Sequence, residues 1–169
     1  LTASPFKPNT IWEKNWILVE NNNELILIYS TLPYFKLFKC TNFDKLLFKC
    51  VKNKKFSVEI EQSTKYTTSD IWIGHSTNPI IYKNHLVYAV HNKFYSKRRY
   101  GQYIVHVDRN TLEPVHISKE PFITQYVKNL LFPLQMFVLN DSLCISGGID
   151  DKYSFYWNFS PKILELDNN

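Results

Sequence analysis

A short, almost continuous apolar strand whose end carries polar residues recurs three times in this chain. The copies are Leu25–Ser30, Leu86–His91 and Leu143–Gly148. Matched positions are 59 residues apart between Tyr29 and Tyr88, and 57 residues apart between Tyr88 and Ile145. A strand-rich repeat of this length is typical of propeller blades or of another repeated β architecture. In a propeller, the polar strand ends of successive blades converge on one central site.

The length of 169 residues is enough to bury a core and would ordinarily give one domain. Propellers have four or more blades of roughly 40 to 50 residues, so three repeats do not close a ring. We therefore expect an all-β fold, with 1–169 forming part of a β-propeller in units at 12–62, 63–122 and 123–169. The missing blades would come from the rest of the chain or from an oligomer partner. An open sheet or a sandwich is the alternative.

Strand signals dominate along the chain. Trp16–Glu20 and Glu24–Ser30 are predicted to form one hairpin, and Tyr103–Val107 and Leu112–Ile117 another. No stretch has convincing helical periodicity over more than three turns. Further strands are expected at Tyr34–Cys40, Leu46–Val51, Ser142–Ser146, Ser154–Phe159 and Ile163–Leu166.

Charge and cysteine content exclude several function classes. The net charge of +5 is mild and the lysines are dispersed, so we expect a solvated face and no nucleic-acid partner. No apolar run approaches the ~20 residues of a membrane span and no signal peptide opens the chain, so we expect it to be soluble, in an unknown compartment. The three cysteines fit neither a disulfide framework nor a zinc site, and no metal is expected.

The tetrapeptide before the first expected strand, Glu13-Lys14-Asn15-Trp16, combines an acid, a base, an amide and an aromatic ring. This is the composition of a sugar subsite, where an aromatic face stacks on C–H groups while polar groups hydrogen-bond to hydroxyls. Lys14, Asn15 and Trp16 are therefore candidate ligand-binding residues. In the alternative interpretation, the tryptophan anchors the sheet beneath ordinary surface charges.

A second cluster joins Gly74–Ile80, His91 at a strand end, and Lys97–Tyr100. Cations and an imidazole in this arrangement favour phosphate or another anion, because arginine pairs bidentately with phosphate oxygens. An exposed basic hairpin loop is the alternative. The candidate phosphate-binding residues are Ser76, His91, Arg98 and Tyr100.

The stretch Ser146–Asp151 places two of the chain's four glycines directly before paired carboxylates. Glycine there permits a positive φ or the close approach of a ligand. A carboxylate after such a turn can bind sugar hydroxyls or take part in acid–base chemistry. Asp150 and Asp151 are therefore candidates, and a tight turn with solvated aspartates is the alternative.

Together these stretches resemble, in the same order and over nearly the whole chain, the five-bladed propellers of glycoside hydrolase family 130. That family comprises mannoside phosphorylases and hydrolases, with related mannosyltransferases and glycosyltransferase-associated propellers. The resemblance is carried by Glu13–Trp16, Ile28–Pro33, Ile73–Ile80, Leu86–His91, Arg98–Tyr100, Ile117–Phe122, Phe132-Pro133 and Ser146–Asp151.

The resemblance implies roles for individual residues. Lys14 would lie in the ligand-binding centre, and His91 matches the histidine that contacts phosphate or the equivalent group. Tyr100 matches the tyrosine that follows it, and Asp151 the aspartate that binds a sugar hydroxyl. The implied co-substrate is inorganic phosphate or a sugar phosphate, and no other cofactor is expected.

The chain also departs from the family pattern. The family's catalytic aspartate lies upstream of the lysine motif, outside this sequence, so no catalytic residue is assigned here. Phosphorylase members carry an arginine where this chain has Ser30 and Thr31, and a glutamate where it has Leu130 and Leu131.

Two hypotheses follow from these similarities and departures. In the first, the chain is the C-terminal part of a propeller enzyme acting on mannose-type glycosides, in which an upstream acid protonates the glycosidic oxygen. Lys14, His91 and Arg98 would then hold phosphate, and Asp151 would orient the sugar ring. In the second, the propeller is a catalytically inactive module for glycan binding or assembly.

Overall fold

The computed structural model shows an all-β chain in which one 3₁₀-helix is the only helix among the described residues. No helix in this part of the chain is long and apolar enough to cross a membrane. The chain divides into two compact units, Leu1–Phe56 and Ser57–Asn169. The described residues are 16–32, 34–56, 71–94, 99–126, 131–140, 142–150 and 152–166.

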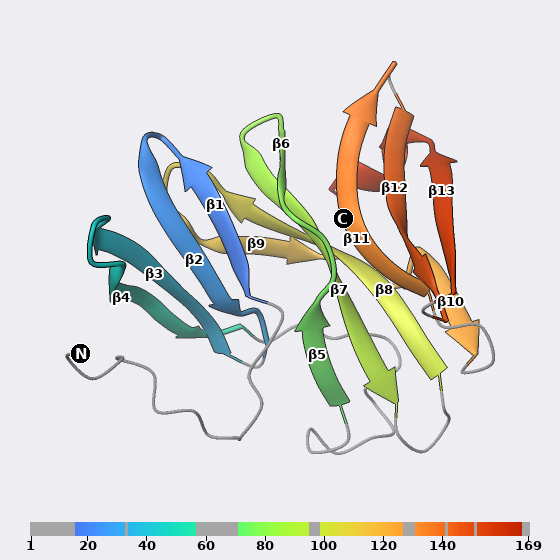
Figure 1. Ribbon diagram of the computed structural model, residues 1–169, viewed down its shortest axis with the longest axis horizontal. Coiled ribbons are helices and arrows are strands. Elements are labelled where there is room, and N and C mark those ends of the chain that lie inside the picture. The colour runs from blue at the N-terminus through green and yellow to red at the C-terminus, as the bar shows by residue number, and fades with distance from the viewer. Residues whose placement is uncertain are drawn as a thin grey trace. The chain divides into compact units, whose positions relative to one another are not determined.

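The first unit contains one four-stranded antiparallel sheet (Figure 1). Its strands pair in chain order: β1 (Ile17–Asn21), β2 (Glu24–Ser30), β3 (Tyr34–Asn42) and β4 (Leu47–Lys55). Asn22 and Asn23, between β1 and β2, have φ values of 52° and 62°. Two successive left-handed residues in a two-residue loop are typical of a type I′ turn, and asparagine tolerates that conformation well. The predicted first hairpin is therefore confirmed.

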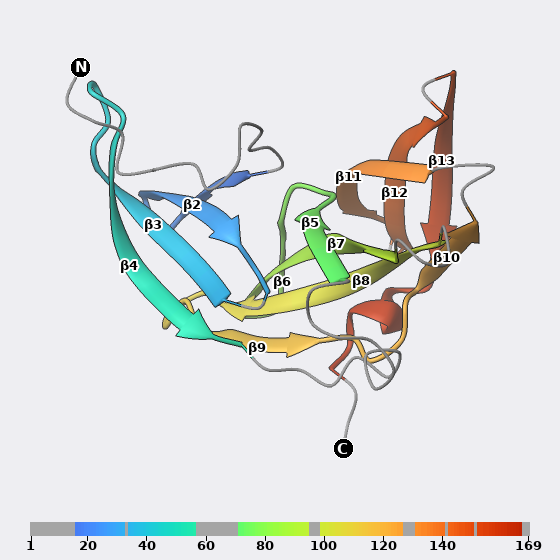
Figure 2. The ribbon, with the colours of Figure 1, turned by 90° about the horizontal axis from the view of Figure 1, so that it is seen from below.

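The second sheet is built on one long antiparallel hairpin, β7 (His85–Phe94) and β8 (Arg99–Asp108). Two short strands lie along β7, and two lie along β8. β5 (Ile71–His75) and β10 (Ile123–Tyr126) pair near one end of this hairpin. β6 (Ile80–Tyr82) and β9 (Pro114–Ile117) pair near the other end, as Figures 1 and 2 show. We call these the β5–β10 end and the β6–β9 end.

The third sheet has three antiparallel strands, in the order β11 (Leu131–Leu139), β12 (Ser142–Ile149) and β13 (Tyr153–Phe159). The strand predicted at Ile163–Leu166 is wrong, because this segment overlaps the 3₁₀-helix Pro161–Leu164. Pro161 lies at the start of the helix, where its fixed φ fits and no backbone donor is lost, and the Ser160 side chain accepts from the Lys162 N–H.

The three repeated apolar stretches all form interior strands. β2, β7 and β12 each pair with a neighbour on both sides. Every side chain of Leu86–Val90 on β7 has an exposed fraction of 0%. A short continuous apolar run is expected where both faces of a strand are buried. The prediction of an all-β fold is confirmed, and the three antiparallel sheets are consistent with part of a β-propeller. The unit boundaries and the number of blades in a ring stay predictions.

One face of the second sheet is apolar in the middle and polar at both ends. Because side chains alternate between faces, His85, Val87, Ala89 and His91 of β7 share a face. The pairing of β7 with β8 places Gln102, Ile104 and His106 on that face too. Val87, Ala89 and Ile104 belong to a buried cluster with side chains of the third sheet and with Leu164. The polar groups therefore lie beyond this core at its two ends.

The two glycines before Asp150 are strand residues and do not form the predicted turn. Gly147 and Gly148 lie within β12 and neither has a positive φ, whereas Asp150 has a φ of 50° in the following turn. A Cβ atom on Gly147 would lie 2.0 Å from the Phe132 carbonyl oxygen. Glycine at 147 therefore permits the close approach of the β11 backbone, not of a ligand.

We expect the Gly147→Ala substitution to lower the free energy of unfolding by about 3 kcal/mol, because β11 would have to move. Gly148→Ala is the matched control, since its Cβ would meet only the Tyr153 carbonyl oxygen at 3.7 Å. That substitution should change stability by less than about 1 kcal/mol. Urea unfolding of both variants measures the difference, and equal stabilities would contradict the close approach.

Candidate functional site

Ser76 is held at the β5–β10 end by backbone contacts with Ala89. The Ser76 N–H donates to the Ala89 carbonyl oxygen at 2.9 Å. The Ala89 N–H in turn donates to Thr77 Oγ1 at 2.9 Å, and Thr77 and Ala89 are both buried. The segment after β5 thus uses both polar backbone groups of Ala89, as buried backbone groups require. This fixes Ser76 beside the end of the apolar core.

Three side chains meet at this end of the sheet. Ser76 Oγ lies 2.8 Å from His91 Nδ1 and 2.8 Å from Gln102 Oε1. His91 and Gln102 are paired residues on β7 and β8, and Gln102 is 1% exposed. The structure therefore brings together the predicted residues Ser76 and His91. Gln102 was missed, because its contact depends on a strand register that the sequence motifs do not reveal.

The hydrogen bonds define the protonation of His91. The Ser76 hydroxyl carries one proton, and Gln102 Oε1 can only accept, so Ser76 donates to Gln102. The Ser76 oxygen then accepts from His91, which places the proton of the neutral ring on Nδ1. Nε2 is accordingly the basic nitrogen of the neutral imidazole.

A second layer of polar groups supports these residues. Asn92 follows His91 on β7 and is fully buried. Its Oδ1 accepts from the Gly101 N–H at 3.0 Å, and its Nδ2 donates to the Tyr103 hydroxyl at 3.3 Å. Gly101 and Tyr103 flank Gln102 on β8. Asn92 thereby holds the strand that carries Gln102, a role that sequence reasoning also missed.

Asn78 connects this end of the second sheet to the third sheet. Its Oδ1 accepts from the Met136 N–H of β11 at 3.2 Å. The predicted residue Asp150 also belongs to the third sheet, in the turn after β12, and is partly buried. Its predicted role in sugar binding stays a prediction.

Trp16 belongs to the first unit and packs on an aromatic neighbour. Its ring stacks on Tyr29 with centroids 5.8 Å apart, and Tyr29 meets Phe38 edge to face at 5.8 Å. Trp16 nonetheless keeps 45% of its surface exposed. One face of the indole therefore anchors the sheet, as the alternative interpretation supposed, while the exposed part retains area for a ligand.

The other predicted site residues are not described at the level of side chains. Tyr100 lies in β8, where it pairs with Lys93 on β7 and Gln125 on β10. The remaining predictions lie outside the described residues: Lys14, Asn15, Arg98 and Asp151.

A cluster of three histidines lies at the opposite, β6–β9 end of the same sheet. The ring of His106 on β8 contacts His85 at 5.6 Å between centroids and His116 at 5.7 Å. His106 is 1% exposed, and neither ring nitrogen has a hydrogen-bond partner in the protein. The three residues come from three strands, so only the register brings them together. Sequence reasoning missed this cluster.

Comparisons with known proteins find a similarity of structure but none of sequence. No protein-family model and no curated protein matches the sequence. Among solved structures, the chain is similar to the β-1,2-mannobiose phosphorylase from Listeria innocua in complex with β-1,2-mannobiose. The TM-score is 0.62 at 15% sequence identity, over 89% of this chain and 45% of the phosphorylase. The similarity shows that the chain shares the fold of part of that protein, and the chain spans less than half of that protein's length.

The buried histidine predicts acid-sensitive stability. Burial, with the nearby imidazoles of His116 and His85, lowers the pKa of His106 from 6.5 to about 3. Between about pH 6.5 and pH 3, His106 is therefore protonated in the unfolded chain but neutral in the folded chain. The free energy of unfolding falls as the pH drops through this range.

Urea unfolding between about pH 7 and about pH 4 measures this fall. The His106→Leu variant should lose stability less steeply with acid, because it has no buried imidazole to protonate. An identical pH dependence in the parent and the variant would show that other groups cause it.

Proposed function

We propose that this chain is the C-terminal part of a five-bladed, carbohydrate-active propeller that processes mannose-type glycosides with phosphate or a sugar phosphate as co-substrate. The observation that carries the proposal is the Ser76–His91–Gln102 hydrogen-bond cluster at the end of a buried repeat strand. The fold shared with a mannobiose phosphorylase supports the choice of substrate class.

The geometry of His91 suits the binding of an anion. With Nδ1–H directed to Ser76, Nε2 is the nitrogen through which the ring would meet a phosphate oxygen. Protonation of Nε2 leaves the bond from Nδ1 to Ser76 unchanged. A protonated His91 would keep this bond and act as a charged donor, and hydrogen bonds from charged donors to phosphate are the stronger kind.

In this proposal the remaining predicted residues complete the site. Lys14 and Arg98 add positive charge beside the phosphate, and Asp151 orients the sugar through its hydroxyls. An acid from outside residues 1–169 protonates the departing glycosidic oxygen while a phosphate oxygen bonds to the anomeric carbon.

A second candidate function is glycan binding without turnover. Phosphorylases of the resembling family carry an arginine and a glutamate where this chain has Ser30-Thr31 and Leu130-Leu131. Thr31 is 3% exposed, and Leu131 is 9% exposed and belongs to the buried apolar cluster of the second unit. These two positions therefore offer no charged group to phosphate, which favours a binding module over a phosphorylase.

We expect the full-length protein, incubated with β-linked mannobiose and inorganic phosphate, to release mannose 1-phosphate. Saturable binding of the disaccharide without any product would support the binding module and contradict the enzyme. Neither product nor binding would contradict both candidates.

We expect His91→Ala to raise the phosphate concentration needed for half-saturation by about tenfold or more, because a charge-assisted hydrogen bond to phosphate is lost. His116→Gln is the matched control, since it alters an imidazole at the other end of the same sheet. Measuring turnover or binding against phosphate concentration separates the two variants, and equal phosphate dependence in both would remove His91 from the site.

Ser76→Ala should raise the half-saturating phosphate concentration by about three- to tenfold, because it removes the acceptor that orients His91 Nδ1. The effect should be smaller than that of His91→Ala, which removes the ring itself. The same phosphate titration measures this effect. If Ser76→Ala matches the parent, the hydrogen bond from His91 to Ser76 does not position the ring for binding.

A further inference from the structure

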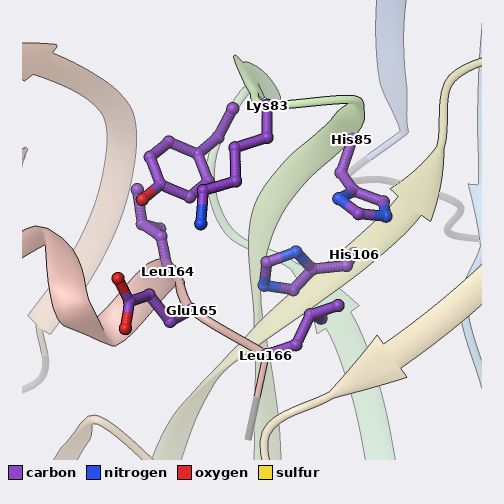
Figure 3. A pocket seen from close by; sticks show the side chains of 7 residues that line it. Lys83, His85, His106, Leu164, Glu165 and Leu166 are labelled. Atoms are coloured by element: carbon purple, nitrogen blue, oxygen red, sulfur yellow. The ribbon is translucent and has the colours of Figure 1, made fainter. Parts of the chain in front are cut away.

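A pocket of about 290 Å³ opens at the β6–β9 end of the second sheet. It lies between the β6–β7 turn, the end of β8 and the residues at and after the end of the 3₁₀-helix, as Figure 3 shows. Its lining residues are Tyr82, Lys83, His85, His106, Leu164, Glu165 and Leu166.

The inner wall of the pocket carries an imidazole whose hydrogen-bonding capacity the protein does not use. The His106 ring is directed toward the space between Lys83 and Glu165 in Figure 3. Neither Nδ1 nor Nε2 has a partner within the protein, and the side chain is 1% exposed. Leaving buried polar groups unpaired costs about 1 to 3 kcal/mol. A molecule in the pocket that pairs with the ring would recover this free energy.

The protonation state of His106 restricts what that molecule can be. The pKa of about 3 keeps the ring neutral near neutral pH, so it offers one N–H donor and one nitrogen acceptor. A hydroxyl group both donates and accepts, and it can pair with either ring nitrogen. A neutral imidazole offers an anionic ligand no charge–charge attraction.

The other lining residues also favour an uncharged ligand. Lys83 and Glu165 are exposed at the rim and carry opposite charges, so together they add no net charge. Both groups hydrogen-bond well to hydroxyls, and Leu164 and Leu166 supply apolar contact for C–H groups. Within the described residues, no three histidine, cysteine, aspartate or glutamate side chains are arranged to hold a metal ion.

We propose that this pocket binds a small uncharged polyhydroxy compound, of the size of a monosaccharide or a cyclitol, through hydroxyl hydrogen bonds to His106, Lys83 and Glu165. The pocket is separate from the Ser76–His91–Gln102 cluster. His85 and His91 are six residues apart on β7, which corresponds to about 20 Å along a strand. The proposal therefore does not depend on the proposed function.

The test uses the full chain with mannose, glucose, myo-inositol and glycerol as probes, followed by saturation-transfer NMR and by the imidazole signals of ¹⁵N-labelled histidine. We expect at least one of the cyclic probes to bind saturably, with a Kd on the order of 1 mM, and to shift the His106 signals. The readout is the His106 signals at the β6–β9 end, which the mannobiose and phosphate assay of the proposed function does not measure, so a failure of the proposed function and a failure of this proposal are distinguishable.

Variants locate the binding. Lys83→Met should weaken it about fivefold to tenfold, and Lys162→Met is the matched control because Lys162 is exposed on the 3₁₀-helix and does not line the pocket. His106→Leu should abolish the saturable binding seen by saturation transfer, and Glu165→Ala provides a second measurement if that variant does not fold.

Several outcomes would overturn the proposal. They are the absence of saturable binding by any polyhydroxy probe, equal weakening by the Lys83 and Lys162 variants, and His106 signals that respond only to inorganic phosphate, glycine or Zn²⁺. The last result would show that the pocket selects a charged ligand.

Discussion

The burial of both faces of β7 is the constraint on which the rest of the second unit depends. Five consecutive side chains, Leu86–Val90, are removed from solvent, so the strand contributes apolar contacts on each side of its sheet. At about 1.5 to 3 kcal/mol for a fully buried large apolar side chain, this short stretch carries much of the unit's stabilisation. Polar side chains are tolerated on this strand only at its ends, where the candidate site and the histidine cluster lie.

The same burial explains why the candidate site is ordered before any ligand arrives. Ala89 lies inside the core, and its backbone groups are satisfied by Ser76 and Thr77. Losing that pairing would leave buried polar groups without partners, so Ser76 is held as firmly as the strand itself. His91 and Gln102 then meet an acceptor and a donor that are already in place, and Asn92 stabilises the neighbouring backbone.

Sequence patterns predicted the parts of this molecule that depend on neighbouring residues. The continuous apolar runs predicted the interior strands, and the strand signals at Trp16–Glu20 and Glu24–Ser30 predicted the first hairpin. Contacts between strands could not be predicted in the same way, because a shift of one residue in register moves every side chain to the other face. Gln102 and the three clustered histidines were missed for this reason.

Local backbone requirements account for the two wrong predictions, the strand at Ile163–Leu166 and the turn at the paired glycines. Ile163–Leu166 reads as apolar strand, but Pro161 and Ser160 begin a helix just before it. The pair Gly147-Gly148 suggested a turn, although glycine at 147 is required by the close contact between the β11 and β12 backbones.

The apolar centre of the second sheet also sets how its two ends can communicate. A proton moves through a protein along donors and acceptors, and Val87, Ala89 and Ile104 offer no side-chain group of either kind on the shared face. No chain of side-chain donors and acceptors therefore crosses this stretch of the face to join the histidines at its two ends. What the two ends do share is the β7–β8 ladder, whose continuous pairing from His85 to Phe94 runs from one to the other.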